Sequence, residues 1–479
     1  MTPTFRSHPG LDSDSGDRGR DGGRTRLGGG ELDTLITVLD LIRTGAAATR
    51  QEIEALSGLG RAVVTDRVAT LMEMGLAGEG ELGPSTGGRA PRRIRFREEA
   101  GYVLTAAIGH TSLGAGLADL SGRLLMEHHE RSGVDDGAEH TLDRLEELFE
   151  WILSEHPVGA SLWGIGLSVA GPVGLPSGET GSGAVVHLAP DWAEHPVAER
   201  LGARFHVPVW VDNDAHLMAL GELRAGCGVQ WNDLLYLKIG TSICAGPVSN
   251  GQVQRGAHGY AGDIGHVAVA DEPLCRCGKV GCLDAVAGGL AIAREAGLAV
   301  TEGRSPYLAQ LARQGIVPTA ADVGRGAYRG DPCCIELLAH CGELVGKSLA
   351  TLVAAWDPSL VVVGGGVSQA GDVLLAAIRD SLARHSRSLA VRDVSIVRTE
   401  LGRTAGLVGA AFAVVEDLFT RERVRAWIAD GRPPRAGEGS PVEAAPGAAQ
   451  WNTGATGAAR PKATRATRRS GVVAKGKRR

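Results

Sequence analysis

The sequence has no uninterrupted apolar run long enough to span a bilayer, which takes about 18 residues. Its N-terminal stretch, MTPTFRSHPGLDSDSGDRGRDGG, also lacks the apolar segment of a secretory signal peptide. These absences argue against a membrane-spanning or secreted protein and predict a cytoplasmic one with no membrane partner. At 479 residues the chain is too long for one compact core, so we expect about two or three domains.

Acidic residues are missing from the C-terminal end of the chain. Residues 460–479 hold nine Lys or Arg and no Asp or Glu, although the whole chain has a formal net charge of −5. Such a segment has little apolar surface to bury, so we predict disorder for most of residues 420–479 and for the Gly-, Asp-, Arg- and Ser-rich residues 1–30. The basic tail can bind polyanions or remain solvated without a specific partner, and composition does not decide between the two.

Three of the eight cysteines lie in one short segment behind a histidine. His266 is followed by Cys275, Cys277 and Cys282, with glycines interspersed. This Cys₃His set can close a tetrahedral zinc shell, and a reducing cytosol favours zinc thiolates over disulfides. We predict a structural Zn²⁺ site, with chance spacing of cysteines as the alternative. The other five are expected to be reduced and packed: Cys227, Cys244, Cys333, Cys334 and Cys341.

Residues 31–98 have the pattern of a winged helix-turn-helix. Apolar residues recur at helical spacing over 32–42, and Thr49 with Glu52 forms a capping box that opens a short second helix ending before Gly58. A third helix follows, and two short strands around a glycine-rich loop, over 75–81 and 85–97, complete the pattern. We expect the inner face of the third helix to carry Val63, Val64, Val68 and Leu71.

The charge placement in this domain favours double-stranded operator DNA as its partner over a role as a protein-interaction module. Arg61, Ala62 and Thr65 lie at the start and outer face of the third helix, where base edges are read. Arg67 on the helix and Arg89 on the wing are expected to contact phosphates. Asp66 is expected to pair with an arginine. Four further wing arginines would add phosphate contacts: Arg92, Arg93, Arg95 and Arg97.

Beyond Gly101 the sequence alternates between strands and helices, which predicts an α/β fold with ligands in the crevice at the strand ends. A helix is expected over 142–153, and the dipeptide Asn250-Gly251 predicts a hairpin turn. One strand each is expected over 102–109, 163–169, 209–212, 234–239 and 360–363, and residues 114–125 are expected to form two more.

Three motifs of this chain, taken in their order along the sequence, resemble the ROK family, which is named for repressors, open reading frames and kinases. They are the sequence VDNDA at 211–215, the zinc segment at 262–282, and three glycines at 364–366 behind a valine strand. The likeness runs from Glu31 to Phe419 and includes the winged helix. It implies a two-lobed actin-like ATPase fold over 99–419 with a sugar between the lobes, and it indicates the repressor branch. A homodimer or homotetramer would then present paired winged helices to a pseudopalindromic operator.

The resemblance also implies a set of sugar-binding residues. Asp214 matches the family's catalytic base and sugar-hydroxyl ligand, with Asn213 beside it. Asp263 and Asp284 match two family glutamates, so both acids are one methylene shorter than the family pattern. His266 would bind zinc through one ring nitrogen and could donate to the sugar through the other. Asn213 and Asp214 can also be explained as an Asx turn that caps the following helix.

Both phosphate loops of the family depart from the kinase pattern. The first, at 107–111, lacks the acid that holds magnesium and has His110 at a glycine position. The second, at 240–244, has Ser242 and Cys244 at glycine positions, where side chains obstruct an anion cradle. We therefore predict no catalytic residues and a sugar-responsive repressor without kinase activity. The alternatives are a sugar kinase with an appended DNA-binding domain and a DNA-bound scaffold that no longer binds sugar.

Overall fold

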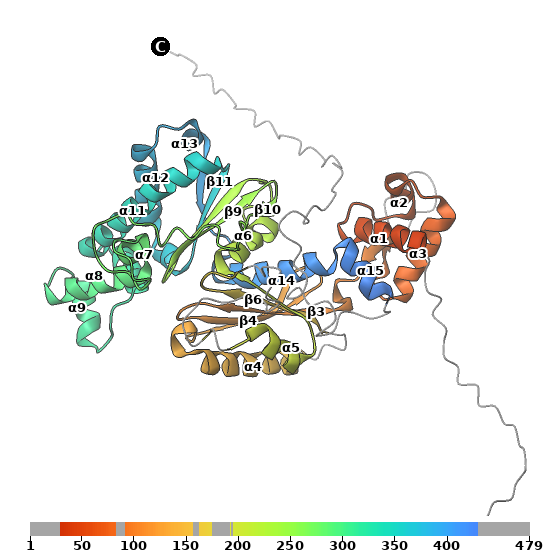
Figure 1. Cartoon of the computed structure of the whole chain (residues 1–479), viewed down its shortest axis with the longest axis horizontal. Helices are drawn as coiled ribbons and strands as arrows, with labels where there is room; N and C mark the ends of the chain where they lie inside the picture. Colours follow the sequence, from red (N-terminus) through yellow and green to blue (C-terminus); the bar gives the residue numbers. More distant parts are fainter. Residues whose placement is uncertain (1–28, 83–91, 157–161, 175–191, 193–194, 430–479) are drawn as a thin grey trace, which may run out of the picture.

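The computed structural model describes residues 29–82, 92–156, 162–174, 192 and 195–429. A small N-terminal domain is followed by two larger units, each with a five-stranded sheet (Figure 1). We call the unit around the first sheet the N-lobe and the unit around the second the C-lobe. The predicted fold class, a winged helix followed by a two-lobed α/β body, is confirmed. The predicted disorder of 1–30 and of most of 420–479 falls mainly outside the described residues.

The N-terminal domain has the element order of a winged helix. Its second helix ends at Gly58, whose φ of 68° lies in the left-handed region that glycine adopts without strain. The two strands pair antiparallel, with Ala77 opposite Phe96. The elements are α1 (Gly29–Arg43), α2 (Arg50–Ser57), α3 (Arg61–Glu73), β1 (Ala77–Leu82) and β2 (Arg92–Phe96).

Two details of this domain differ from the sequence prediction. Thr49 Oγ1 accepts from the Glu52 amide at 3.2 Å, but the Glu52 carboxylate accepts from the Ala48 amide at 2.8 Å, one residue earlier than the predicted Thr49 amide. Val63 is 36% exposed, whereas Val64 is fully buried, so the placement of Val63 on the inner face is wrong. Successive residues of a helix point about 100° apart, and the core contacts one side of α3 only.

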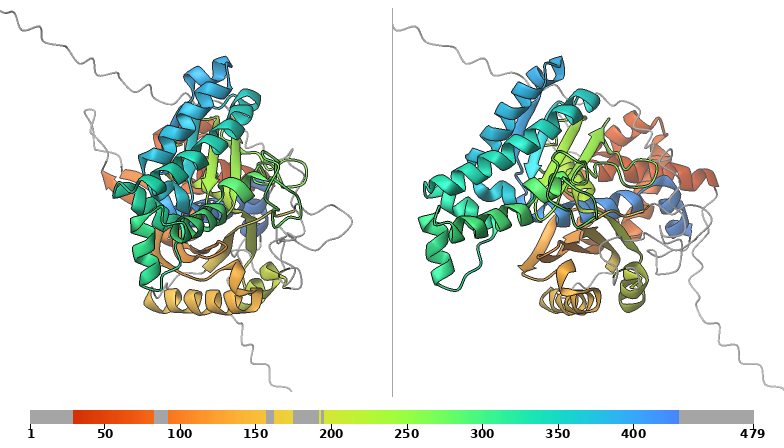
Figure 2. Two further views of the ribbon diagram at one scale, coloured as in Figure 1. Left: turned by 90° about the vertical axis from the view of Figure 1, so that its left-hand side faces the viewer. Right: turned by 60° about the vertical axis from the view of Figure 1, so that its left-hand side comes forward.

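The N-lobe sheet has the strand order β5-β4-β3-β6-β7, in which β3, β6 and β7 run parallel. Helices α4 (Ala138–Glu155) and α5 (Val197–Phe205) cover one face, where Leu142 and Phe149 enter the core (Figure 2). The strands are β3 (Tyr102–Ile108), β4 (Leu113–Asp119), β5 (Leu124–Glu130), β6 (Leu162–Val169) and β7 (Val209–Asn213).

The C-lobe sheet has the strand order β10-β9-β8-β11-β12, with β8, β11 and β12 parallel. The predicted hairpin at Asn250-Gly251 joins β9 and β10, and both residues have positive φ. The strands are β8 (Leu234–Ile239), β9 (Ile243–Ser249), β10 (Gln252–Val253), β11 (Leu360–Gly364) and β12 (Ser395–Arg398). The helices are α7 (Leu283–Ala287), α8 (Gly289–Thr301), α9 (Pro306–Arg313), α10 (Ala320–Tyr328), α11 (Pro332–Trp356), α12 (Asp372–His385) and α13 (Leu389–Asp393).

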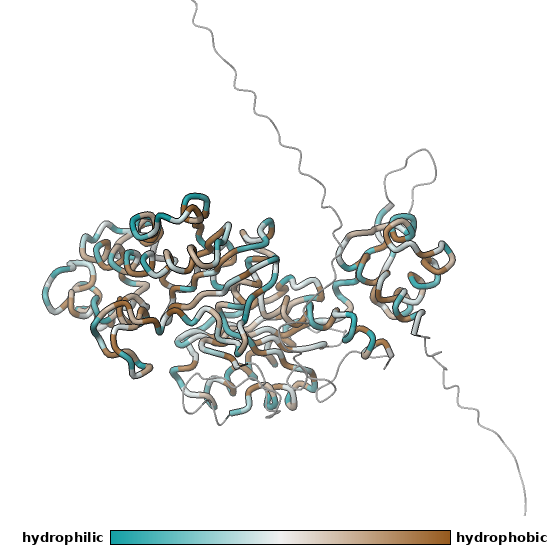
Figure 3. The backbone as a smooth tube through the Cα atoms, turned by 45° about the horizontal axis from the view of Figure 1, so that its top comes forward, coloured by the Kyte–Doolittle hydropathy of each residue, from teal (hydrophilic) through white to brown (hydrophobic). Residues whose placement is uncertain are grey.

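Helix α11 is long and apolar enough to cross a membrane by length and composition alone. Its apolar residues instead belong to the C-lobe core: Cys341, Val345 and Leu349 are buried there with residues of β8, β11 and α12. Hydrophobic stretches, drawn in brown in Figure 3, occur in both lobes. The apolar character of α11 is therefore explained by its position in the core.

Two helices cross between the lobes. Helix α6 (Asp214–Ala225) packs on the C-lobe sheet, helix α14 (Ala405–Leu418) packs on the N-lobe sheet, and the two pack on each other. Their crossing depends on Gly409, because a Cβ there would overlap the carbonyl of Leu217. Movement of one lobe against the other would therefore alter the packing of this helix pair.

A final helix, α15 (Arg421–Ala429), packs against α1 of the winged helix. Its buried residues Val424, Trp427 and Ile428 share one apolar cluster with the winged-helix core and with Phe419. The position of α15, directly after α14, is visible in Figure 1. The start of the predicted C-terminal extension therefore belongs to the junction between the winged helix and the N-lobe.

Candidate functional site

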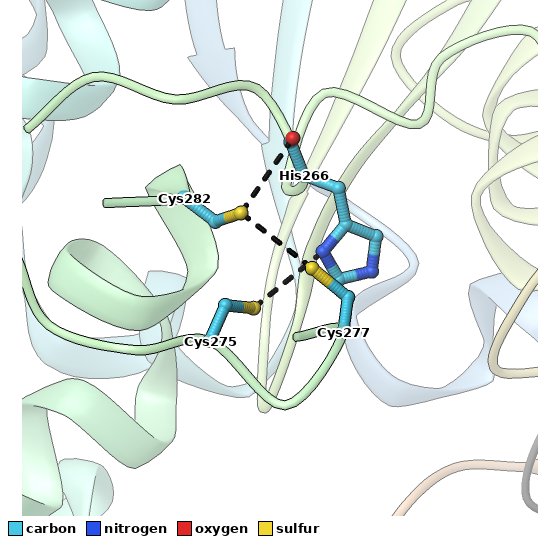
Figure 4. Close-up of side chains that lie close together, drawn as sticks. All are labelled: His266, Cys275, Cys277 and Cys282. Atoms are coloured by element: carbon cyan, nitrogen blue, oxygen red, sulfur yellow. Dashed lines mark hydrogen bonds between the residues drawn. The ribbon is translucent and has the colours of Figure 1, made fainter. Parts of the chain in front are cut away.

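His266, Cys275, Cys277 and Cys282 lie together in the segment between β10 and α7 (Figure 4). Their ligand atoms are all within 4.8 Å of one another. His266 Nδ1 is 3.7 Å from Cys275 Sγ, and Cys277 Sγ is 3.7 Å from Cys282 Sγ. The structure thus brings the four predicted ligands together.

The backbone of this segment turns tightly around the four side chains. Gly281 has a φ of 70°, and a Cβ there would overlap the carbonyl of Ala270, so only glycine fits. A hydrogen bond from the Lys279 amide is the main cause that lowers the pKa of the Cys277 thiol. Three thiols and one imidazole in this spacing fit a four-coordinate Zn²⁺ ion, and all eight cysteines are free of disulfides.

Asp214 begins α6 and lies at the point where the two lobes meet. Its carboxylate is 5% exposed and forms an ion pair with Lys238, which comes from β8 of the C-lobe. The second carboxylate oxygen, Oδ1, is 3.7 Å from Cys244 Sγ. Burial alone would lower the pKa of the Lys238 ammonium, but the adjacent Asp214 raises it, so Lys238 is charged. Sequence reasoning missed Lys238.

Asn213 is the N-cap of α6. Its Oδ1 accepts from the amides of Ala215 at 2.9 Å and His216 at 3.4 Å, and its Nδ2 donates to the Gly171 carbonyl at 2.7 Å. The capping explanation of Asn213 is therefore confirmed. Because both polar atoms of the side chain already have partners, a direct contact with a sugar remains a prediction.

The two shortened acids lie in the C-lobe, Asp263 between β10 and α7 and Asp284 in α7. Asp284 Oδ1 accepts from the Ile243 amide at 2.6 Å. Burial raises its pKa, and Asp263, Lys238 and His266 act on it electrostatically. Asp263 is exposed. Burial raises the pKa of the Cys244 thiol, and the charges of Asp214, Asp284 and Asp263 raise it further, so all three predicted carboxylates act on one side chain.

The first phosphate-loop position is occupied by protein side chains. His110, which follows β3, has its Nδ1 3.2 Å from Asp135 of the N-lobe. Burial and the charge of Lys238 lower the pKa of His110, so its imidazole is neutral at pH 7. Arg276, between two cysteines of the Cys₃His cluster, is 4.0 Å from the same Asp135. In the second loop, Ser242 Oγ is 3.5 Å from Lys238 Nζ. His110 and Ser242, the side chains at two of the predicted glycine positions, thus contact other side chains of the protein.

The exposed face of α3 carries the predicted base-reading residues. Arg61, Ala62 and Thr65 are all exposed, and the Thr65 hydroxyl donates to the Arg61 carbonyl at 2.8 Å. Asp66 accepts from Arg67 at 2.7 Å, which confirms the expected pairing of Asp66 with an arginine. Arg89 lies outside the described residues.

Arg67 does not face outward with its neighbours. It is 7% exposed, and its Nε donates to Thr34 Oγ1 of α1 at 2.9 Å. The predicted phosphate contact by Arg67 is therefore wrong. It lies one helical turn before Leu71 on the inner side of α3, where its guanidinium ties α3 to α1. The wing arginines Arg92, Arg95 and Arg97 are at or near the surface and pair with Glu79 or Glu99. Surface pairs of this kind are weak, about 0–1 kcal/mol, so these arginines remain available to phosphates.

A winged helix joined to a two-lobed α/β body defines a class of proteins that combine a DNA-binding domain with the fold of ROK kinases. The ROK family model matches residues 103–417, which is most of the chain. The chain therefore belongs to the ROK family.

Relatives of two kinds match the chain over different lengths. A glucokinase from Halalkalibacterium halodurans is 33% identical over 292 residues, or 60% of this chain and 87% of its own. A xylose repressor from Caldicellulosiruptor bescii is 27% identical over 390 residues, or 80% of this chain and 96% of its own. The match to the repressor is thus longer than the match to the kinase.

The solved structures show the same division. The crystal structure of a ROK family transcriptional regulator, described as a homologue of the E. coli MLC protein, covers 84% of this chain and 99% of its own, with a TM-score of 0.66 and 21% identity. The structure of a ROK glucokinase from Streptomyces griseus in complex with glucose and AMPPNP covers 65% of this chain and 99% of its own, with a TM-score of 0.56 and 30% identity. At its low identity, the regulator supports the likeness of fold alone.

Proposed function

We propose that this protein is a sugar-responsive DNA-binding repressor of carbohydrate metabolism, present in the cytoplasm. The observation that carries the proposal is the exposed base-reading face of α3 on a winged helix whose core is continuous with the N-lobe. Two relatives that match 80% and 79% of this chain are named as xylose repressors, which supports both a sugar effector and operator DNA as partners.

The sugar is proposed to bind between the lobes. Asp214, Asp263 and Asp284 supply acceptors for sugar hydroxyls, and carboxylates accept such bonds through two oxygens. Asn213 holds the N-terminus of α6, and with it Asp214, in position. His266 has Nδ1 directed at the cysteines, which leaves Nε2 as a donor toward the sugar. Closure of the lobes on a sugar would then shift α6 and α14 and, through α15, the winged helix.

We propose that the protein does not phosphorylate the sugar. His110 lies in the first phosphate loop, and Ser242 and Cys244 obstruct the second. Asp214, the matched catalytic base, is already paired with the ammonium group of Lys238. A kinase with an appended DNA-binding domain is the alternative, and a glucokinase relative at 33% identity makes it worth testing.

Zn²⁺ is proposed as a structural ion held by His266 Nδ1 and the three cysteines. Bound zinc would fix the loop between β10 and α7 and thereby orient the His266 ring. Asp263 lies within this loop, and Asp284 lies in α7, which directly follows it. The ion would therefore support the sugar site without taking part in a reaction.

The experiment uses the full chain, zinc-loaded, with a DNA duplex from its own promoter region at fixed salt. We expect a mobility shift whose midpoint changes on addition of xylose, glucose, N-acetylglucosamine or N-acetylmannosamine. A coupled ADP-release assay with the same sugars and MgATP should give background rates only. Turnover above background would favour the kinase, and intact DNA binding without any sugar response would favour a scaffold.

A further inference from the structure

Lys238 is a charged residue at the end of an otherwise apolar strand. In the β8 sequence LLYLKI, Leu235 and Leu237 face the C-lobe helices, whereas Leu234 and Tyr236 face α6. Because side chains alternate along a strand, Lys238 lies on the side of Leu234 and Tyr236 and points toward the start of α6. Its side chain is 8% exposed. A lysine so deeply buried needs a partner, and here the partner is Asp214.

The ammonium group of Lys238 has three N–H donors. One is directed at Asp214 Oδ2, and a second lies 3.5 Å from Ser242 Oγ. Among the described residues no third hydrogen-bond acceptor contacts it, so one donor remains for a ligand. Asp214 retains acceptor capacity as well, since a carboxylate has about four lone-pair positions. Donor and acceptor therefore lie side by side.

We propose that Lys238 is an effector-binding residue that, together with Asp214, receives one hydroxyl group of the sugar. The hydroxyl donates its hydrogen to Asp214 and accepts from Lys238 with its oxygen. This inference rests on the proposed sugar site and adds a residue that the family motifs did not supply. The surrounding carboxylates of Asp263 and Asp284 favour a neutral sugar over an acidic one.

The same arrangement separates binding from chemistry. A phosphoryl acceptor needs a free lone pair on its hydroxyl oxygen to attack phosphorus, and it needs a base to take its proton. Here Asp214, the group that would serve as this base, is already paired with the Lys238 ammonium. Lys238 thus competes with the sugar hydroxyl for the same carboxylate, independently of the altered phosphate loops.

The test measures sugar affinity by calorimetry on the full, zinc-loaded chain, with xylose, glucose, N-acetylglucosamine and N-acetylmannosamine as probes. Lys238→Met removes the donor but keeps most of the apolar stem, and Lys238→Gln keeps a neutral donor in case the methionine variant does not fold. Lys347→Met, at an exposed position on α11, is the matched control. We expect Lys238→Met to weaken binding about ten- to hundredfold, Lys238→Gln less, and Lys347→Met not at all.

A second measurement separates contact from general damage. Monodeoxy analogues of the bound sugar are compared on the wild-type chain and on the two Lys238 variants. Removal of the contacted hydroxyl should weaken binding to the wild type and change binding to the Lys238 variants little, since these have lost the same interaction. If the wild type and the folded Lys238 variants bind the sugar equally well, Lys238 has no role in binding. The same holds if every analogue loses the same affinity on the wild type and on the variants. Either result leaves the proposed sugar site itself standing. A wild type that binds none of the four probes overturns the sugar site itself.

Discussion

Phe96, the last residue of the wing strand β2, packs edge-on against Phe419, which directly follows α14, with ring centroids 5.5 Å apart. Trp427 of α15 meets Phe419 from another side at 6.1 Å, and Trp163 of the N-lobe stacks on Phe419 at 6.2 Å. One ring thus contacts the winged helix, the N-lobe and α15. Since α14 also packs on α6, which begins at Asp214, a continuous set of contacts leads from the proposed sugar site to the DNA-binding domain.

Truncation separates the role of α15 from that of the basic tail. A chain ending at residue 419 loses Val424, Trp427 and Ile428, each of which contributes about 1.5–3 kcal/mol through burial. We expect a clearly lower melting temperature and weaker operator binding. The matched control, a chain ending at residue 429, keeps α15 and should melt like the full chain. Equal melting of both truncated chains would contradict the assigned role of α15.

Arg61 and Arg67 should give opposite phenotypes despite lying on the same helix. Arg61→Ala should leave the melting temperature unchanged, weaken DNA binding and reduce the slope of log affinity against log salt by about 1. Arg67→Ala breaks the bond to Thr34 and should lower the free energy of unfolding by about 1–3 kcal/mol. Thermal unfolding and fluorescence anisotropy of labelled DNA measure the two effects. If the Arg67→Ala protein were as stable as the wild type and its slope of log affinity against log salt were reduced, Arg67 would contact a phosphate after all.

Removal of one zinc ligand should affect metal content and the sugar site before DNA binding. Cys277 is exposed, so Cys277→Ser changes a ligand with little change in packing. We expect loss of bound zinc by elemental analysis and a lower sugar affinity, with promoter binding retained. Cys227→Ser, outside the cluster, should keep a full equivalent of zinc. Metal content that is the same in both variants would count against the four-ligand site.

Substitutions of Asn213 test whether this residue acts mainly as the cap of α6 or as a direct contact to the sugar. Asn213→Ala removes the acceptor for the Ala215 amide and should lower the free energy of unfolding by about 1 kcal/mol. Asn213→Asp keeps a capping acceptor and should be stable. If Asn213 acts only through the cap, the aspartate variant also keeps the sugar affinity of the wild type. A large loss of affinity in that stable variant would instead indicate a direct contact.

The sequence predicted the winged helix, most strands and the Cys₃His cluster because each depends on local spacing. It missed Lys238 because the ion pair with Asp214 joins residues 24 apart on different elements, although a lysine in an apolar strand was a usable signal. The burial of Arg67 depends on how α3 is rotated against α1, which no local pattern fixes. Helix α15 carries apolar residues at 424, 427 and 428, a helical spacing that its many charged neighbours obscured.

The central claim is that the space between the lobes and the winged helix are energetically coupled. Coupling is reciprocal, so operator DNA must change sugar affinity by the same factor by which sugar changes operator affinity. The direct test is calorimetric titration of the effective sugar into the full chain, with and without a saturating operator duplex. We predict dissociation constants that differ by about five- to 150-fold, matching the sugar-induced shift in DNA binding. Identical constants with and without operator would contradict the account.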